Sequence, residues 1–459
     1  MRLPSPWAPR LAPEPGAPSE RLVAALSADI IDGRLGSGAR LPAHRDLAWR
    51  LGIGVGTVTK AYAVLERRGL VRSVRGSGTF VAVAEARRGP LIDLSQNVPA
   101  AVLRERLLSR TLSAIARRVD SGLFNAYPPV GGHDEHRRQM ARWFAGLGIA
   151  ADPARLLLTV GAQHAIAVAF SAACGRDGAI YTEAQTYAGA IALARHQGLR
   201  LAGLAMDAEG LLPEALDRAL ARHAGGQAAV YLMPTQQNPT TSTMTRARRE
   251  AIIAICRARD AVIVEDDVYT LAAAPELPAL VTLAPERTIY VNGLSKTLNP
   301  ALRIGALLLP EGLRGRAEAV LRATALMVSS MSCAVMQQWL LDGTAETVRR
   351  AIQDEARRRN ALARSFLGAA IAPARQDGHH VWLPMPQPEA EQLETVARAL
   401  GVVVTPPAST TAAPEVAGAG VRLCIGAPSM AELTTGLATI AGILAQRSEG
   451  ASLPAAAIG

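Results

Sequence analysis

The sequence predicts an α/β protein in which a small basic head precedes a large body built on a mostly parallel sheet. Two observations predict this organisation. In residues 91–446, short apolar strand-like runs alternate with amphipathic helical patterns, which is typical of a parallel sheet covered by helices on both faces. Residues 1–88 hold 14 basic and 7 acidic side chains, whereas the remainder of the chain holds 35 and 32. A basic head in front of a nearly neutral body suggests binding to a polyanion.

Length and composition limit the possible classes of protein. The 459 residues are enough for two or three domains, and 49% of them are hydrophobic, as in a globular protein. The four cysteines lie far apart, without the spacing of a metal site or disulfide framework, so we expect no metal and a reducing cytoplasm. Residues 1–18 are proline-rich and lack the apolar segment of a signal peptide, so a disordered leader is predicted. Polar residues interrupt the apolar runs 156–175 and 323–341, which favours buried elements over membrane spans.

Residues 19–82 have the pattern of a winged helix-turn-helix. Amphipathic periodicity and glycine stops predict three helices, at 20–32, 44–51 and 57–68. Strand-like runs at 70–74 and 79–81 follow directly and flank the turn Arg75-Gly-Ser-Gly78. A hairpin directly after a helix-turn-helix predicts a wing. Residues 83–90 form a short linker to the body.

A set of short motifs in this head carries a family resemblance. The motifs are Gly33-Arg-Leu35, Leu41-Pro42, Arg45-Asp-Leu-Ala48, Thr57-Val58, Ala61-Tyr62, Leu65-Glu66, Gly69-Leu-Val71 and Gly76-Ser-Gly-Thr-Phe-Val81. Together they resemble the DNA-binding head of the GntR family of bacterial transcription regulators. The family usually opens its third helix with Ser-Arg, but this sequence has Gly54 and Val55. One capping hydroxyl and one DNA-facing charge are therefore absent, so base preference is expected to differ and affinity to be modest.

The resemblance implies that the third helix enters the major groove of double-stranded DNA. Outward-facing residues of that helix could then contact phosphates or base edges, and wing residues could approach the DNA backbone. For each basic residue taken singly, a solvated surface charge is the alternative. The candidate DNA-binding residues are Arg45, Thr57, Thr59, Lys60, Arg72, Arg75, Gly76 and Gly78.

The body is organised around the stretch from Val291 to Gly305, which contains Lys296. The chain has only two lysines, Lys296 and Lys60, because 47 of its 49 basic residues are arginine. A guanidinium stays protonated and cannot form an imine, whereas a lysine amine can lose its proton and attack a carbonyl. Apolar flanking residues imply a buried site, although a stray surface lysine is the alternative.

The motif Ser295-Lys296, followed by Leu302-Arg-Ile-Gly305, resembles the Schiff-base segment of pyridoxal 5′-phosphate (PLP) enzymes with the aspartate aminotransferase fold, fold type I. The resemblance covers about residues 91–446. It implies a large domain with a mixed, mostly parallel sheet and a small C-terminal α+β lobe at about 375–446, followed by a disordered tail at 447–459. It also implies that Lys296 forms the Schiff base with PLP.

The resemblance carries over to the loops that follow the predicted strands. Ala162 and Gln163 would hold the phosphate at a helix N-terminus, and Arg303 would clamp it bidentately. Gly293 replaces a usual Ser or Thr, so one hydroxyl contact is lost, for which Ser295 could compensate.

Other matched residues face the ring and the substrate. Tyr187 would stack on the pyridine ring, and Asn238 and Tyr269 would bond its 3′-oxygen. Asp266 would pair with the protonated ring nitrogen and keep the ring an electron sink. A metal site at Glu265-Asp266-Asp267 is disfavoured, because no other ligand cluster accompanies it. The remaining matches are Arg422, for a substrate carboxylate, and Tyr127, for the phosphate of a partner subunit in a homodimer.

A GntR-type head joined to a fold type I body is the arrangement of the MocR subfamily. The leading hypothesis is therefore a PLP-dependent transcription regulator that binds a DNA operator and senses an amino compound through external aldimine formation at Lys296. One alternative is an active aminotransferase with an appended head. Another is a DNA-binding repressor whose body is only a cofactor-free dimerisation scaffold.

Overall fold

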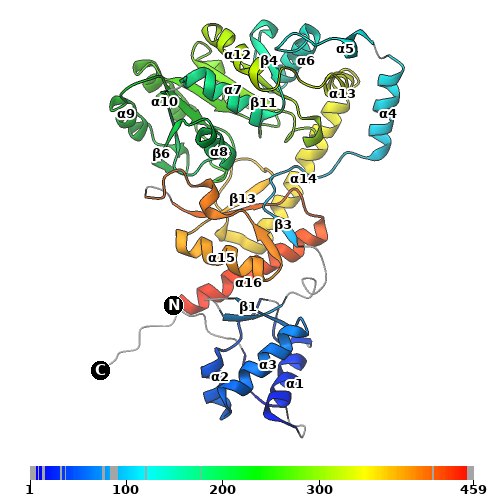
Figure 1. Ribbon diagram of the computed structural model, residues 1–459, viewed down its shortest axis with the longest axis vertical. Coiled ribbons are helices and arrows are strands. Elements are labelled where there is room, and N and C mark those ends of the chain that lie inside the picture. Colours follow the sequence, from blue (N-terminus) through cyan, green and yellow to red (C-terminus); the bar gives the residue numbers. More distant parts are fainter. Residues whose placement is uncertain are drawn as a thin grey trace.

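The computed structural model shows an elongated molecule with the head at one end, the large lobe at the other and the small lobe between them (Figure 1). Arg75, Gly76 and the linker 83–90 lie outside the residues that the structure describes. Those residues are 7–8, 10–12, 16–31, 34–36, 38–74, 78–82, 91–118, 121–175, 177–415 and 418–451.

The head consists of three helices and a hairpin, in the order expected of a winged helix-turn-helix. Its core is made by apolar side chains that recur at helical spacing, such as Leu22, Leu26 and Leu65. Gly52 adopts a left-handed conformation (φ 63°) that turns the chain between the second and third helices. The elements are α1 (Pro18–Ile31), α2 (His44–Leu51), α3 (Val55–Arg67), β1 (Val71–Val74) and β2 (Gly78–Val81).

The described part of the leader packs on the head, which differs from the expected disorder. Trp7 is 5% exposed and belongs to the head core together with Ala12. The Trp7 indole donates to Asp29 Oδ2 at 2.8 Å, and Arg10 makes an ion pair with the same carboxylate. A buried aromatic ring with a satisfied N–H orders this stretch, a tertiary effect that proline content did not reveal.

The large lobe is built on a seven-stranded sheet with the predicted mixed, mostly parallel topology. Only β12 runs antiparallel to its neighbours, β11 and β4. The strands are β4 (Leu156–Thr159), β12 (Gly305–Leu308), β11 (Thr288–Gly293), β10 (Val262–Asp266), β9 (Ala228–Leu232), β5 (Ala179–Glu183) and β6 (Arg200–Leu204), in that spatial order. A two-stranded ribbon, β7 (Met206–Asp207) and β8 (Gly210–Leu211), lies outside the sheet.

Helices cover this sheet, as the alternation of elements predicted. The helices of the large lobe are α4 (Glu105–Ala116), α5 (Gly122–Asn125), α6 (Asp134–Ala145), α7 (Ala162–Cys174), α8 (Ala188–His196), α9 (Pro213–Ala221), α10 (Arg246–Ala258), α11 (Leu280–Leu283), α12 (Arg314–Thr324) and α13 (Ser330–Leu341). Helices α12 and α13 are separated at Leu326, whose positive φ of 64° is not compatible with a continuous helix. Within the described residues, no helix is both long and apolar enough to cross a bilayer.

The small lobe contains more of the chain than the predicted 375–446. Strand β3 (Ile92–Leu94), directly after the linker, pairs in parallel with β14 (Val402–Val404). Helix α16 (Met430–Ala451) continues past residue 446, where a disordered tail was expected to begin. The remaining elements are α14 (Thr344–Leu367), β13 (His380–Pro384), α15 (Gln387–Ala399) and β15 (Gly420–Cys424).

The packing of Trp7 predicts that the leader stabilises the head. We expect Trp7→Ala to lower the free energy of unfolding of the head by about 3 kcal/mol, the lower range for removing a buried Trp. The matched control is Trp49→Ala, since Trp49 is 83% exposed on α2 and its removal should change stability by less than about 0.5 kcal/mol. Denaturant unfolding followed by circular dichroism measures both, and equal effects would contradict the packing.

Candidate functional site

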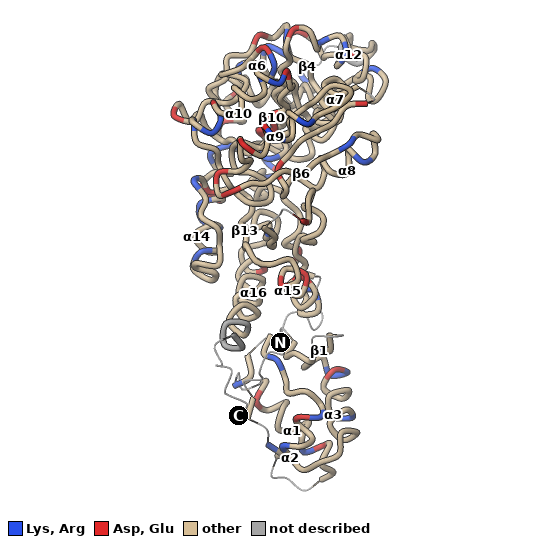
Figure 2. Tube along the Cα trace, turned by 90° about the vertical axis from the view of Figure 1, so that its left-hand side faces the viewer, with Lys and Arg blue, Asp and Glu red and all other residues tan. Residues whose placement is uncertain are grey.

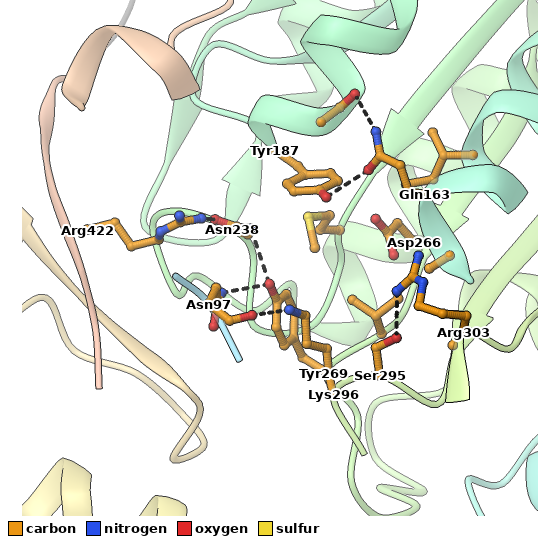
Figure 3. Close-up of a pocket in the computed structure, with 16 residues that line it drawn as sticks. Asn97, Gln163, Tyr187, Asn238, Asp266, Tyr269, Ser295, Lys296, Arg303 and Arg422 are labelled. Carbon is orange, nitrogen blue, oxygen red and sulfur yellow. Dashed lines mark hydrogen bonds between the residues drawn. The ribbon is translucent and has the colours of Figure 1, made fainter. Parts of the chain in front are cut away.

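A cavity of about 390 Å³ opens at the carboxyl ends of the sheet strands, beside the small lobe (Figure 3). In open α/β sheets this edge is where ligands usually bind. Among the residues predicted to hold PLP, all but Tyr127 line the cavity. They are Ala162, Gln163, Tyr187, Asn238, Asp266, Tyr269, Ser295, Lys296 and Arg303, and the predicted carboxylate-binding Arg422 joins them.

Asp266 lies at the end of β10, is 2% exposed and uses only one of its two carboxylate oxygens in a side-chain hydrogen bond among the described residues. Its Oδ2 accepts a hydrogen bond of 2.7 Å from the Tyr231 hydroxyl on β9. Its Oδ1 is buried without a hydrogen-bond partner among the described residues. Burial raises the pKa of Asp266 to about 7. A protonated ring nitrogen would satisfy Oδ1 and stabilise the charged carboxylate, so the site fits the pyridine of PLP.

Lys296 follows β11, the strand next to β10, and points into the same cavity. Its amine donates to the backbone carbonyl of Asn97, in the segment after β3. Burial lowers the pKa of Lys296 to about 8, since a desolvated ammonium is less stable than a neutral amine. The neutral form that attacks carbonyl groups is therefore more populated near neutral pH than in an exposed lysine.

The N-terminus of α7 and Arg303 form one end of the cavity. Gly161 precedes the helix with φ 79°, and a Cβ built on it would lie 2.5 Å from the Arg303 Nη2 atom. A glycine is therefore needed for the guanidinium to approach the helix N-terminus. Arg303 Nη1 donates to the Ser295 hydroxyl at 3.3 Å. Helix N–H groups, a guanidinium and a hydroxyl together fit a phosphate dianion.

Tyr187 and Gln163 form a linked pair above the cavity (Figure 3). The Tyr187 hydroxyl donates to Gln163 Oε1 at 2.7 Å, and Gln163 Nε2 donates to the Gly189 carbonyl at 3.1 Å. Both side chains are thus held in place, which leaves the Tyr187 ring available for stacking.

The Tyr269 hydroxyl collects two amide donors on the opposite side of the cavity. Asn238 Nδ2 donates to it at 3.1 Å, and Asn97 Nδ2 donates at 2.8 Å. Asn97 and Tyr231 were missed by the sequence analysis. Asn97 stands in a polar run after a strand, and Tyr231 places a hydroxyl in a buried strand, where such groups need a partner.

Arg422 is 7% exposed on β15 and is held by neutral acceptors only. Its guanidinium donates to Asn238 Oδ1 at 2.6 Å, Thr405 Oγ1 at 3.1 Å and the Ser95 carbonyl at 3.2 Å. Among the residues that the structure describes, no carboxylate lies within ion-pair distance of it. A buried guanidinium without a counter-ion favours an anionic ligand.

Tyr127 is 78% exposed and does not line the cavity of its own chain. Its expected contact with the phosphate of a partner subunit stays a prediction.

The head presents several of its predicted DNA-binding residues to solvent. Arg45, Thr59 and Lys60 are exposed, and Thr57 is partly exposed near the start of α3. The Thr59 hydroxyl donates to the Val55 carbonyl and lies 3.1 Å from the His44 ring. Gly54 precedes α3 without a side-chain cap, as the missing Ser predicted.

The structure assigns Arg72 and Gly78 of the wing to other contacts. Arg72 Nη1 donates to the carbonyl of Ala399 in the small lobe. A Cβ on Gly78 would lie 2.8 Å from Arg40 Nε, so this glycine makes room for an arginine of the head. Contact of Arg72 and Gly78 with DNA stays a prediction, since the structure shows an exposed Arg72 that is bound to the small lobe and wing strands that lie between the head and that lobe. Arg75 and Gly76 lie outside the described residues.

Comparison with known proteins agrees with both parts of the chain. Residues 89–440 match the family described as aminotransferase class I and II, and residues 18–81 match the bacterial regulatory proteins of the gntR family. The chain is 25% identical to the uncharacterised HTH-type transcriptional regulator YdeF of Bacillus subtilis, over 95% of this chain and 96% of YdeF. It is 27% identical to the vitamin B6 salvage pathway transcriptional repressor PtsJ of Salmonella typhimurium, over 92% and 97%.

Solved structures with the same fold are aminotransferases. An archaeal alanine:glyoxylate aminotransferase superposes with a TM-score of 0.71 at 20% identity, over 85% of this chain and 95% of that one. LysN, an α-aminoadipate aminotransferase of Thermus thermophilus complexed with N-(5′-phosphopyridoxyl)-L-leucine, gives 0.68 at 23% identity, over 78% and 93%. These likenesses show fold type I for the body.

The lowered pKa of Lys296 predicts the pH dependence of cofactor attachment. The neutral amine fraction should rise steeply with pH below about 8, reach one half near the pKa and level off about one unit above it. The rate at which PLP attaches to cofactor-free protein, followed by stopped-flow absorbance from pH 6 to 10, should do the same. A rate that still climbs tenfold per pH unit above 9 would mean that burial does not lower this pKa. Lys296→Ala is the control and should show no attachment.

Because Asp266 Oδ1 is buried without a hydrogen-bond partner among the described residues, we expect this carboxylate to contribute strongly to cofactor affinity. Hydrogen bonds to charged groups contribute about 1.5–3 kcal/mol, so Asp266→Asn should weaken PLP binding roughly 10- to 100-fold. The same change at the exposed Asp260 is the control and should leave the affinity unchanged. Equilibrium titration by absorbance measures both, and wild-type affinity in Asp266→Asn would remove this carboxylate from the site.

Proposed function

Because the chain belongs to the aminotransferase class I and II family and carries a gntR-family head, we propose that it is a PLP-dependent transcription regulator of the MocR type. The head binds duplex DNA, and the body senses an amino compound at Lys296. One observation carries the proposal: a helix-turn-helix with an exposed third helix shares a chain with a cavity that combines Lys296, Asp266 and a phosphate-binding helix end. Relatives named as transcriptional regulators are similar in sequence to this chain over nearly their whole length.

Different residues of the cavity would bind different groups of PLP. When bound, PLP supplies an aldehyde that condenses reversibly with amines and a ring that withdraws electrons. Asp266 holds a proton at the ring nitrogen, while Arg303 and the N-terminus of α7 hold the phosphate. Lys296 supplies the amine that an incoming amino compound has to displace.

A carboxylate on the effector is supported by Arg422. This buried guanidinium faces only neutral acceptors in the described part of the chain, so a carboxylate would relieve an uncompensated charge. An amino acid or a related amino carboxylate is therefore the proposed effector class.

A homodimer in the cytoplasm completes the proposal. Exposed apolar side chains on the neighbouring helices α4 and α13, Leu108, Leu112, Met331 and Leu341, would be covered by a second copy. Tyr127 would then reach the phosphate of the partner. Duplex DNA as ligand and four cysteines without disulfides support a cytoplasmic location.

Transamination is the second candidate function. It is favoured by the presence of all the predicted cofactor residues around Lys296 and by the aminotransferase structures that share the fold. Incubating the PLP-loaded protein with amino acids and an oxo acid, and measuring the amino acid product, tests it.

The regulatory proposal predicts an effector response that requires Lys296. Operator fragments can be selected from random-sequence duplex DNA with the PLP-loaded protein. Their affinity should change about 5- to 150-fold when the right amino carboxylate is added, the usual range of allosteric coupling. Lys296→Ala should still bind the fragments but should not respond. DNA binding by wild-type protein that is indifferent both to PLP and to a broad panel of amino acids would contradict the proposal.

A further inference from the structure

The hairpin of the head has two faces, and the structure buries them against different parts of the molecule. Alternation along the strands puts Val71 and Val81 in the core of the head. It puts Val74 and Phe80 in the apolar cluster of the small lobe, where they are 8% and 2% exposed. Arg72 is paired directly with Phe80 across the hairpin and shares its face. The wing is therefore a layer between head and lobe, as β1 shows in both views (Figures 1 and 2).

Polar contacts fix this layer at the end of α15. The carbonyls of Val396, Ala397 and Arg398 accept from backbone N–H groups of the following turn, whereas that of Ala399 accepts from the Arg72 guanidinium. A cation at a helix C-terminus also complements the helix dipole. Arg72 thus caps a helix of the body from within the head.

A second contact joins the head to α16. Gln446 Nε2 donates to the Gly38 carbonyl at 2.9 Å. Gly38 belongs to the segment that pairs with β2, because its N–H donates to the Val81 carbonyl. A Cβ on Gly38 would lie 3.6 Å from the Leu400 side chain, so the backbone of the head passes close to an apolar side chain of the lobe here.

The same cluster supports the candidate effector site. Val421 and Leu423 of β15 belong to the cluster that holds Val74 and Phe80. Arg422, between them in sequence, points to the opposite face of the strand and into the cavity. Helix α15 contacts both β15 and the wing strand β1, so it connects the strand that carries the predicted carboxylate contact to the docked wing.

We propose that the strands β1 and β2 of the wing are a docking element for the small lobe and that Arg72 serves this docking rather than DNA contact, so that head and small lobe move as one unit. Among the described candidate residues, DNA contact falls to the exposed residues of α2 and α3, at the end of the molecule remote from the large lobe (Figure 1). For its effector half this inference rests on the proposed function: a shift of the small lobe on ligand binding carries the head with it through Arg72, Phe80 and Gln446.

Salt dependence of DNA binding separates docking from DNA contact. Each phosphate contact that is lost lowers the slope of log affinity against log salt by about 1. With the PLP-loaded full chain and a selected duplex, Lys60→Ala should lower the slope by about 1, whereas Arg72→Ala should leave it unchanged. A fall of about 1 in Arg72→Ala would overturn the proposal.

Hydrogen exchange tests docking without DNA or effector. Arg72→Ala should speed deuterium uptake at the end of α15 and the following turn, residues 396–402, and Lys60→Ala should not. Equal protection of this segment in both variants would overturn the docking. A wild-type protein that binds no duplex would refute the proposed function, yet the exchange result would still decide whether the wing is docked.

The effector response supplies the last readout. Arg72→Ala should titrate with amino compounds as wild type does when PLP absorbance is followed, because Arg72 does not line the cavity. The effector-induced change in operator affinity should shrink at least several-fold. A full response in this variant would show that the signal reaches the head by another route.

Discussion

The site depends on one constraint: a carboxylate and an amine have to be buried together at the ends of two neighbouring parallel strands. Asp266 ends β10 and Lys296 follows β11, so strand pairing fixes their separation before any ligand arrives. Burial destabilises the charged form of both groups: it raises the pKa of Asp266 to about 7 and lowers the pKa of Lys296 to about 8. A buried site that destabilises both charges is suited to a ring that carries a proton at one end and an aldehyde at the other.

The departure of this sequence from the usual phosphate-binding pattern has a steric counterpart in the structure. A Cβ at Gly293 would lie 3.0 Å from the Cβ of Ala162, at the start of α7, so a Ser here would have little room unless the helix shifted. The hydroxyl of Ser295 instead lies within hydrogen-bonding distance of Arg303. The position of the missing hydroxyl, at Gly293, and the hydroxyl of Ser295 therefore lie at the same end of the cavity, which supports Ser295 as a phosphate ligand.

Much of the fold and site could be predicted from the sequence, because the signals were local. Lys296 stood out as one of only two lysines, and Asp266 and Arg303 were assigned from short motifs that resemble those of fold type I enzymes. Features created by tertiary packing escaped. Tyr231 meets Asp266 only through strand pairing, and Trp7 is ordered only by the α1 surface. The alternation of residues along the wing shows that Arg72, Val74 and Phe80 share one face of the hairpin. Nothing in the local sequence shows that this face packs on the small lobe.

Strand β15 offers a physical basis for modularity in how such proteins diversify. Its residues alternate between a face that lines the cavity, at Arg422, and a face that packs in the apolar cluster to which Val74 and Phe80 of the wing also belong, at Val421 and Leu423. Substitutions at the first face can therefore alter chemical preference while the packing behind it, and the output it serves, stay intact. After gene duplication, a copy could in this way change the ligand that it binds while the packing between small lobe and head stays the same.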